Sequence, residues 1–287
     1  MTAVLLALAV LATLMLGAVL AVAMDRRIAQ LAAGLARQRI ETEAPDRLNR
    51  NLAPVWYFAL AAAGLSVVPF APGLALLDSP VGIVIWGACE ALTIVAVFLH
   101  GWSPNAPFPL IGAYRYVAIG LPVMLPSMFV LIAAALPAQS LSLLAIVESQ
   151  REMWNVTRQP LGLPLFTIVV LTLTLRGPMD FADAADIATG TSAEESGAAR
   201  VVWEVARAAM LVSASAIAAT VFLGGPLGPV LPGPAWLWIK TAALMAIFTW
   251  LGHRVARTTP SRMLTILWVI LLPLSFVHLA IAGVIAL

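Results

Sequence analysis

Apolar runs recur along the whole chain and constrain its fold more than any other feature. Many of them reach about 20 residues, the length that a helix needs to cross the hydrocarbon core of a bilayer. The mean hydropathy over the chain is +0.98. Transmembrane barrels would need strands in which apolar and polar residues alternate, whereas these runs are continuously apolar. The sequence therefore predicts an all-α, polytopic helical membrane bundle that forms one membrane domain over residues 1–287.

About eight transmembrane helices are expected, separated by turns rich in proline and glycine. Their expected positions are 1–24, 53–70, 81–100, 115–136, 160–176, 201–223, 236–252 and 264–286. The first run has no positive residue before it, so we expect a retained helix and not a cleaved secretory signal. We place its start outside the cell, because this puts twelve loop arginines inside and only two outside. Both termini should then lie outside the cytoplasmic membrane, with the loops at about 25–52, 101–114, 177–200 and 253–263 in the cytoplasm.

Several classes of function lack their sequence signatures. The single cysteine, Cys89, lies in an apolar run, so the chain has no disulfide and no Cys-x-x-Cys pattern for an iron–sulfur cluster. Phosphate-binding loops and serine-nucleophile motifs are absent. The three histidines, His100, His253 and His278, show no metal-ligand spacing and are expected to pack or to lie at interfaces, although His278 could also relay a proton. We expect no catalytic residue, metal or cofactor in this chain, and no nucleic-acid partner.

An acidic loop interrupts this apolar chain. Five of its 14 acidic residues fall within 16 positions between two apolar helices: Asp180, Asp183, Asp186, Glu194 and Glu195. Hydrocarbon does not solvate such a loop, so it must meet water or a protein partner. It is either a solvated turn or a partner surface at which Asp180 or Asp183 admits protons.

A series of short motifs, in order across about residues 53–280, resembles subunit 1 of respiratory complex I. Arg176-Gly177-Pro178-Met179-Asp180 is similar to the family's Arg-Ala-Pro-Phe-Asp, and Glu194-Glu195-Ser196-Gly197 to its Glu-Tyr-Ser-Gly. Further similar motifs are Gly101-Trp102-Ser103-Pro104-Asn105, Leu110-Ile111-Gly112-Ala113-Tyr114-Arg115, Gln159-Pro160-Leu161-Gly162, Phe222-Leu223-Gly224-Gly225, Trp236-Leu237-Trp238-Ile239-Lys240 and Leu271-Leu272-Pro273-Leu274.

The same subunit type occurs in energy-converting nickel–iron hydrogenases and formate hydrogenlyases. Glu204 lies seven residues after Gly197, which is similar to the hydrogenase branch, whereas the complex I glutamate would fall on Arg207. The Asp-Gln pair and lysine that complex I carries near the C-terminus are absent around 261–269. These features favour the hydrogenase branch.

The resemblance implies a membrane subunit of a multisubunit, ion-translocating oxidoreductase. Such a subunit catalyses nothing by itself. It docks the peripheral redox arm and couples electron transfer to proton or sodium movement. The implied partners are a hydrogenase-like large subunit, an iron–sulfur subunit and antiporter-like membrane subunits. These would carry the iron–sulfur clusters and, in the hydrogenase branch, a nickel–iron centre. Quinone binding stays open, because two family carboxylates fall on Met124 and Leu173.

Two sets of residues are candidates for these roles. The first set is expected on the proton path: Glu90, Asp180, Asp183, Glu204, Arg207 and Lys240. Glu90, within an apolar run, must be protonated or paired across helices. Glu204 and Arg207 are either a static ion pair or a charge switch, and Lys240 either snorkels to the surface or acts in the interior. The second set is expected to dock partners: Arg26, Arg27, Arg115, Arg176, Asp186, Glu194 and Glu195. The arginines of segment 26–50 could instead bind anionic lipid.

Two other functions remain open from the residues alone. The loss of carboxylates at Met124 and Leu173 fits a membrane anchor with the same partners but no ion conduction. A stand-alone secondary transporter could use the acidic loop as a substrate or cation vestibule.

Overall fold

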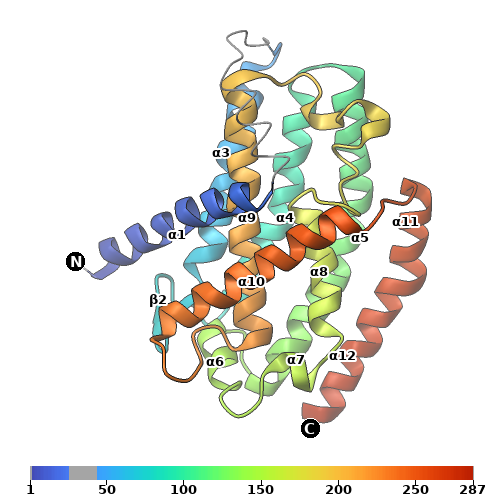
Figure 1. Cartoon of the computed structure of the whole chain (residues 1–287). Helices are drawn as coiled ribbons and strands as arrows, with labels where there is room; N and C mark the ends of the chain where they lie inside the picture. Colours follow the sequence, from blue (N-terminus) through green and yellow to red (C-terminus); the bar gives the residue numbers. More distant parts are fainter. Residues whose placement is uncertain (1, 26–43, 287) are drawn as a thin grey trace.

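The computed structural model describes residues 2–25 and 44–286, which form a helical bundle (Figure 1). It confirms the all-α expectation, apart from one small antiparallel hairpin of β1 (Pro69–Ala71) and β2 (Leu74–Ala75). The docking prediction for Arg26 and Arg27 lies outside the described residues.

Each expected transmembrane segment corresponds to a helix. In order these are α1 (Thr2–Met24), α3 (Arg47–Ser66), α4 (Gly82–Trp102), α5 (Pro107–Ala135), α8 (Gly162–Leu173), α9 (Gly197–Leu223), α10 (Gly233–Arg254) and a last segment made of α11 (Pro260–Ile266), a π-helical turn (Leu267–Leu271) and α12 (Leu272–Ala286). Short helices α6 (Leu143–Glu148) and α7 (Asn155–Arg158) and the turns η1 (Leu136–Ala138), η2 (Ala185–Ile187) and η3 (Gly190–Ser192) lie between them.

The expected count of eight spans is too high by the criterion of length and composition. Within the described residues, six helices are long and apolar enough to cross a membrane. Helix α3 falls short because its first turn carries Arg47, Asn49 and Arg50, and α8 because it has only 12 residues. The loop expected over 101–114 is also shorter, since α4 continues to Trp102 and α5 begins at Pro107.

Helix α9 forms the centre of the bundle. It packs against α3, α10, α1 and α8, and 89% of its apolar window is buried. Alanine and serine follow one another along its second half, so neighbouring helices can approach its backbone closely. The last helical segment is its opposite: only 17% of it is buried, as in a helix whose apolar side chains face lipid. Helices α1 and α10 cross the bundle obliquely (Figure 1).

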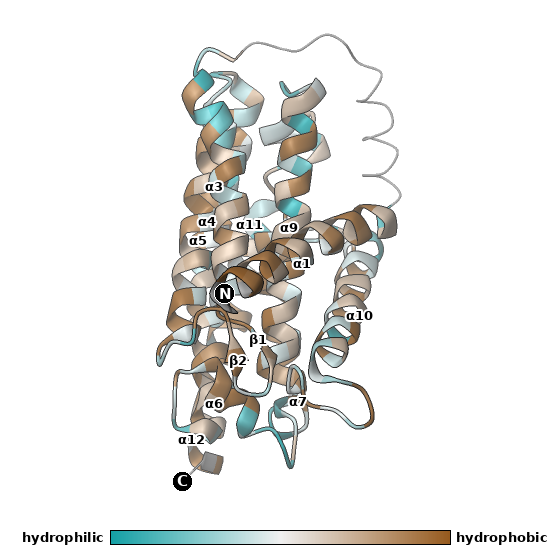
Figure 2. Ribbon diagram, turned by 90° about the vertical axis from the view of Figure 1, so that its left-hand side faces the viewer, coloured by the Kyte–Doolittle hydropathy of each residue, from teal (hydrophilic) through white to brown (hydrophobic). Residues whose placement is uncertain are grey.

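Contacts between distant parts of the chain gather the four expected inner loops at one end of the bundle, here called the loop end. The Asp46 amide donates to the Ser103 carbonyl at 3.3 Å, and Arg257 contacts Asp180 at 3.1 Å. Figure 2 shows hydrophobic residues along the helix shafts and hydrophilic ones towards their ends. The grouping of these loops on one side therefore agrees with the predicted topology, and which side faces the cytoplasm remains a prediction.

The acidic loop (residues 174–196) folds back onto the ends of α4 and α5. Small residues permit this approach. A Cβ atom built on Gly112 would collide with the carbonyl oxygen of Ala182 and would lie 2.9 Å from the amide nitrogen of Thr191. That amide donates to the Ala182 carbonyl at 3.0 Å, which closes the loop on itself. The loop is thus a folded cap on the helices.

Candidate functional site

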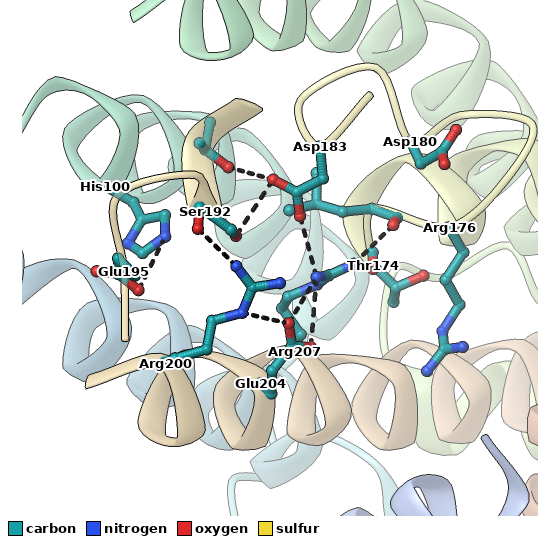
Figure 3. Close-up of polar contacts among 12 residues, drawn as sticks. His100, Thr174, Arg176, Asp180, Asp183, Ser192, Glu195, Arg200, Glu204 and Arg207 are labelled. Carbon is teal, nitrogen blue, oxygen red and sulfur yellow. Dashed lines mark hydrogen bonds and ion pairs between the residues drawn. The ribbon is translucent and has the colours of Figure 1, made fainter. Parts of the chain in front are cut away.

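Arg207 lies at the centre of a charge network where α9 meets the acidic loop (Figure 3). Its Nη1 atom lies 3.0 Å from Asp183 Oδ2 and 3.2 Å from Glu204 Oε1, and its Nη2 donates to the Leu175 carbonyl at 2.7 Å. The side chain is only 13% exposed. The predicted ion pair between Glu204 and Arg207 is therefore confirmed, and the loop carboxylate of Asp183 joins it.

Glu204 is held by a second arginine. Arg200 Nε lies 3.2 Å from Glu204 Oε1, one helical turn earlier on α9. Arg200 Nη1 also donates to the Ser192 carbonyl at 2.7 Å, so this arginine ties the loop to the helix. Glu204 thus lies between two guanidinium groups.

Asp183 is held by the loop itself. Its Oδ1 atom accepts hydrogen bonds from Thr191 Oγ1 at 2.5 Å and from Ser192 Oγ at 3.3 Å, while Oδ2 faces Arg207. Two carboxylates and two guanidinium groups make a network with no net formal charge. Such balance is what a buried set of charges requires, because an unpaired buried ion costs several kcal/mol.

A second buried pair, Arg176 with Asp25, lies beside this network. Their side chains meet at 2.7 Å, with 9% and 5% exposed, and His253 Nε2 lies 3.4 Å from the other carboxylate oxygen. Arg176 was expected to dock a partner, but its guanidinium is occupied inside the chain. Asp25 was not predicted as a site residue. Its position directly after the first apolar run was the available signal.

The outer rim of the loop carries exposed charges. Arg115 donates to Asp186 at 2.6 Å, which holds the pKa of that carboxyl below its usual range. Arg257 lies 3.1 Å from Asp180 and 3.7 Å from Asp186. Asp180, Asp186 and Arg115 remain accessible, as contact with a partner would require, although they bind one another.

A cavity of about 260 Å³ separates the network from the Asp25–Arg176 pair. Its charged lining residues are Asp25, Arg176, Asp180, Asp183, Arg200, Glu204, Arg207 and His253. The structure therefore brings three of the expected proton-path acids, Asp180, Asp183 and Glu204, to one water-sized space. Within residues 2–25 and 44–286, no group of three or more His, Cys, Asp or Glu side chains could hold a metal ion.

Glu195 is buried, contrary to its expected docking role. Its side chain is 3% exposed, and its Oε2 atom lies 3.5 Å from His100 Nε2. Burial raises the pKa of Glu195 to about 7, against the attraction of Arg200 and Arg50. Its neighbour Glu194 lines a second cavity of about 280 Å³ together with Arg50, Ser103 and Glu195.

Glu90 and Lys240 lie apart from the network. Glu90 is fully buried in α4 and accepts hydrogen bonds from Trp86 Nε1 at 2.5 Å and from Ser127 Oγ of α5 at 2.6 Å. The expected partner across the helices is thus a hydroxyl. Ser127 stands one turn beyond Met124, so a carboxylate from α4 reaches the part of α5 where the family carboxylate is lost.

Lys240 binds the far end of α9. Its Nζ donates to the carbonyls of Leu223, Gly225 and Leu227 at 2.6, 3.0 and 2.6 Å and lies 4.5 Å from the ring centroid of Trp154. A lysine there satisfies the carbonyl end of the helix, which Gly224 terminates in a left-handed conformation. Leu223 is roughly 28 Å along α9 from Glu204 at 1.5 Å per residue, so Lys240 is remote from the network.

Comparison with known proteins gives consistent matches. A family profile described as NADH dehydrogenase matches residues 26–283. The first H-type NADH-quinone oxidoreductase subunit of Rhodopseudomonas palustris (strain HaA2) is 35% identical over 241 residues, covering 84% of this chain and 76% of that protein. The second such subunit of Rhizobium meliloti (strain 1021) is 30% identical over 252 residues (84% and 77%), and the one of Magnetococcus marinus is 31% identical over 252 residues (85% and 74%). These relatives carry the name of the quinone oxidoreductase, so they do not support the expected leaning towards the hydrogenase branch.

Proposed function

Because this chain belongs to the subunit 1 family of NADH dehydrogenase, we propose that it is the membrane subunit of a multisubunit, ion-translocating oxidoreductase. In this role it docks the peripheral redox arm and couples electron transfer to the movement of protons or sodium ions. The observation that carries the proposal is the neutral network of Asp183, Arg200, Glu204 and Arg207, which joins the acidic loop to the central helix.

The network is suited to coupling because its charges are balanced and shared between two elements. Asp183 belongs to the loop, whereas Glu204 and Arg207 belong to α9. Protonation of either carboxylate leaves a buried excess positive charge, which favours a rearrangement of the groups around Arg207. A partner that moves the loop would equally displace Asp183 from Arg207. Redox events in the peripheral arm and proton binding beside α9 can therefore influence each other.

We place partner contact at the exposed rim of the loop, formed by Asp180, Asp186 and Arg115. The names of the relatives support partners of the complex I type, whereas the position of Glu204 is the feature that favours a hydrogenase-like large subunit. Iron–sulfur clusters belong to the partners in either case, and antiporter-like subunits would lie against the membrane helices.

Quinone does not fit the 260 Å³ cavity on its own. Its lining holds four carboxylates, from Asp25, Asp180, Asp183 and Glu204, but only a few apolar groups such as Leu175. A long apolar tail gains little in such a lining. We therefore propose that this cavity serves proton exchange. A quinone site would require surfaces supplied by a partner.

The assembly is tested by gentle detergent extraction of the tagged chain from its native membrane, followed by mass spectrometry of the proteins that stay bound. Recovery of a complex-I-like or hydrogenase-like large subunit, iron–sulfur subunits and antiporter-like subunits is the expected result, and it identifies the branch. Recovery of a folded, monodisperse chain alone would refute the proposal and favour the stand-alone transporter.

Coupling is tested in the purified assembly reconstituted in vesicles. The Glu204→Gln and Glu90→Gln variants should lower the number of protons moved per electron while the complex still assembles. Glu148→Gln is a matched control, because Glu148 pairs with Arg151 on the surface, with 60% of its side chain exposed.

A non-conducting anchor is the second candidate. Its support is that Leu173 is fully buried among apolar residues and that Met124 packs against the same core, where the family carries carboxylates. Unchanged proton movement in both glutamine variants, at normal assembly, would establish the anchor in place of a coupling subunit.

A further inference from the structure

His100 and Glu195 meet at the loop end outside the network of Arg207. His100 lies in the last turn of α4 and is fully buried, and Glu195 lies just before α9. Their atoms Nε2 and Oε2 are 3.5 Å apart. The two residues differ from the family pattern at least once, because Glu195 stands where the motif Glu-Tyr-Ser-Gly has tyrosine.

Polar atoms of this pair lack hydrogen bonds. Both ring nitrogens of His100 and the Oε2 atom of Glu195 are buried without a hydrogen-bond partner among the residues that the structure describes. Unsatisfied buried polar atoms are rare in folded proteins and call for an explanation. A shift of a few tenths of an ångström would bring Nε2 and Oε2 to ordinary hydrogen-bond distance.

An aromatic stack fixes the orientation of the imidazole. The ring of His100 lies on Trp203 of α9 with centroids 3.6 Å apart and planes only 9° from parallel. Trp203 in turn stacks on Tyr57 of α3 at 5.2 Å. Since the ring is held between packed helices, Nε2 stays directed towards Glu195 (Figure 3).

Charged groups surround the pair on several elements. Arg50 of α3 and Arg200 of α9 favour an ionised Glu195, whereas burial, Asp183 and Glu204 disfavour it. Arg207 acts on His100 together with those two arginines. Glu194 is the adjacent acid in the loop. The balance raises the pKa of the Glu195 carboxyl to about 7, so this group exchanges its proton near neutral pH.

The second cavity gives the pair a route to water. It measures about 280 Å³ and is lined by Glu195, Glu194, Arg50 and Ser103. Glu195 therefore has one oxygen near an internal base and lies on a space that admits several water molecules.

We propose that His100 and Glu195 form a buried acid–base pair that holds one exchangeable proton and loads it from water through the second cavity. In one state the proton is on Glu195 Oε2 and His100 is neutral. In the other it has moved to His100 Nε2, which leaves an imidazolium beside a carboxylate. Uptake of a second proton from water gives an imidazolium beside a carboxylic acid, and no group is oxidised or reduced. The inference deepens the proposed function, since it identifies a proton-loading site close to the Glu204 network.

The test is nitrogen NMR of the full chain in lipid nanodiscs, labelled with ¹⁵N at its three histidines. Subtraction of the His100→Gln spectrum assigns the signal of His100. We expect this signal to change with a midpoint near pH 7, and we expect Glu195→Gln to abolish that transition. Glu194→Gln is the control and should retain it. A His100 signal that stays constant between about pH 5.5 and about pH 8.5, or that is the same in Glu195→Gln as in the unchanged chain, would overturn the proposal.

Infrared spectroscopy keeps the proposal testable if Glu195→Gln does not fold. The carbonyl band of a buried carboxylic acid should grow as the pH falls through about 7, and His100→Gln should move its midpoint. A midpoint that His100→Gln leaves in place would show that the two groups do not share a proton. Neither measurement needs a partner protein, so its failure is distinguishable from failure of the assembly or of coupling.

Discussion

Replacing Arg207 by methionine removes a guanidinium that contacts both Asp183 and Glu204, while a side chain of similar length keeps the packing. In the unchanged chain these contacts measure 3.0 and 3.2 Å, and the carboxylates are 10% and 8% exposed. The variant leaves an excess negative charge in a site that water hardly reaches. We therefore expect it to lower the free energy of unfolding substantially.

The magnitude follows from which contacts remain. Breaking a buried ion pair by removing one partner costs roughly 3–5 kcal/mol. Glu204 keeps Arg200 at 3.2 Å, and Asp183 keeps the hydroxyl groups of Thr191 and Ser192. The loss should therefore lie at the lower end, about 3 kcal/mol. The control Arg151→Met breaks an exposed pair with Glu148, whose side chains are 59% and 60% exposed, and should cost about 0.5 kcal/mol.

The assay is reversible unfolding of the chain in mixed micelles of a mild detergent and dodecyl sulfate, followed by circular dichroism. The double variant Arg207→Met with Glu204→Gln should recover part of the loss, because it restores the charge balance. If Arg207→Met and Arg151→Met differ by less than about 1 kcal/mol, the network does not behave as a buried ion cluster and the reasoning fails.

Three further predictions concern separate features. Gly112→Ala should push the acidic loop away from α5 and weaken binding of the partner subunits in the extraction experiment, because its Cβ would meet the Ala182 carbonyl; Gly283→Ala, with nothing within 4 Å, should have no effect. Lys240→Met should lower the free energy of unfolding by about 3 kcal/mol, since three carbonyls at the end of α9 lose a charged donor, and equal stability of both proteins would contradict this. Because the folded-state pKa of Glu195 is raised from 4.5 to about 7, the folded state binds its proton more tightly, and stability should fall as the pH rises from 4.5 to 7, by up to about 3 kcal/mol; a pH titration of unfolding should show this slope in the unchanged chain but not in Glu195→Gln.

Continuous apolar runs were sufficient to predict the helices, because the bilayer requires about 20 apolar residues per span. The same reasoning miscounted the spans at α3 and α8, where the helix exists but polar residues or a short length remove it from the set that composition supports. Helix formation there is decided by packing against α9, α4 and α5.

The pair of Glu204 and Arg207 was predictable because residues three apart on a helix lie on one face. Its third member, Asp183, was expected to admit protons, but no local spacing indicated that its carboxylate would reach Arg207, 24 residues further along the chain. Long-range pairs such as Arg176 with Asp25 depend on the path of the loop, which residue spacing does not encode.

The sequence by itself determined that this protein is a multi-pass helical membrane protein, which family it resembles, and which acids cannot lie in hydrocarbon, because these properties follow from composition and local motifs. Only the tertiary structure decided that Arg176 and Glu195 are buried and that Lys240 holds the end of α9. It alone placed His100 beside Glu195. The physical reason is that burial and partner choice depend on which helices pack together, and residues far apart in the chain become neighbours only when the bundle has formed.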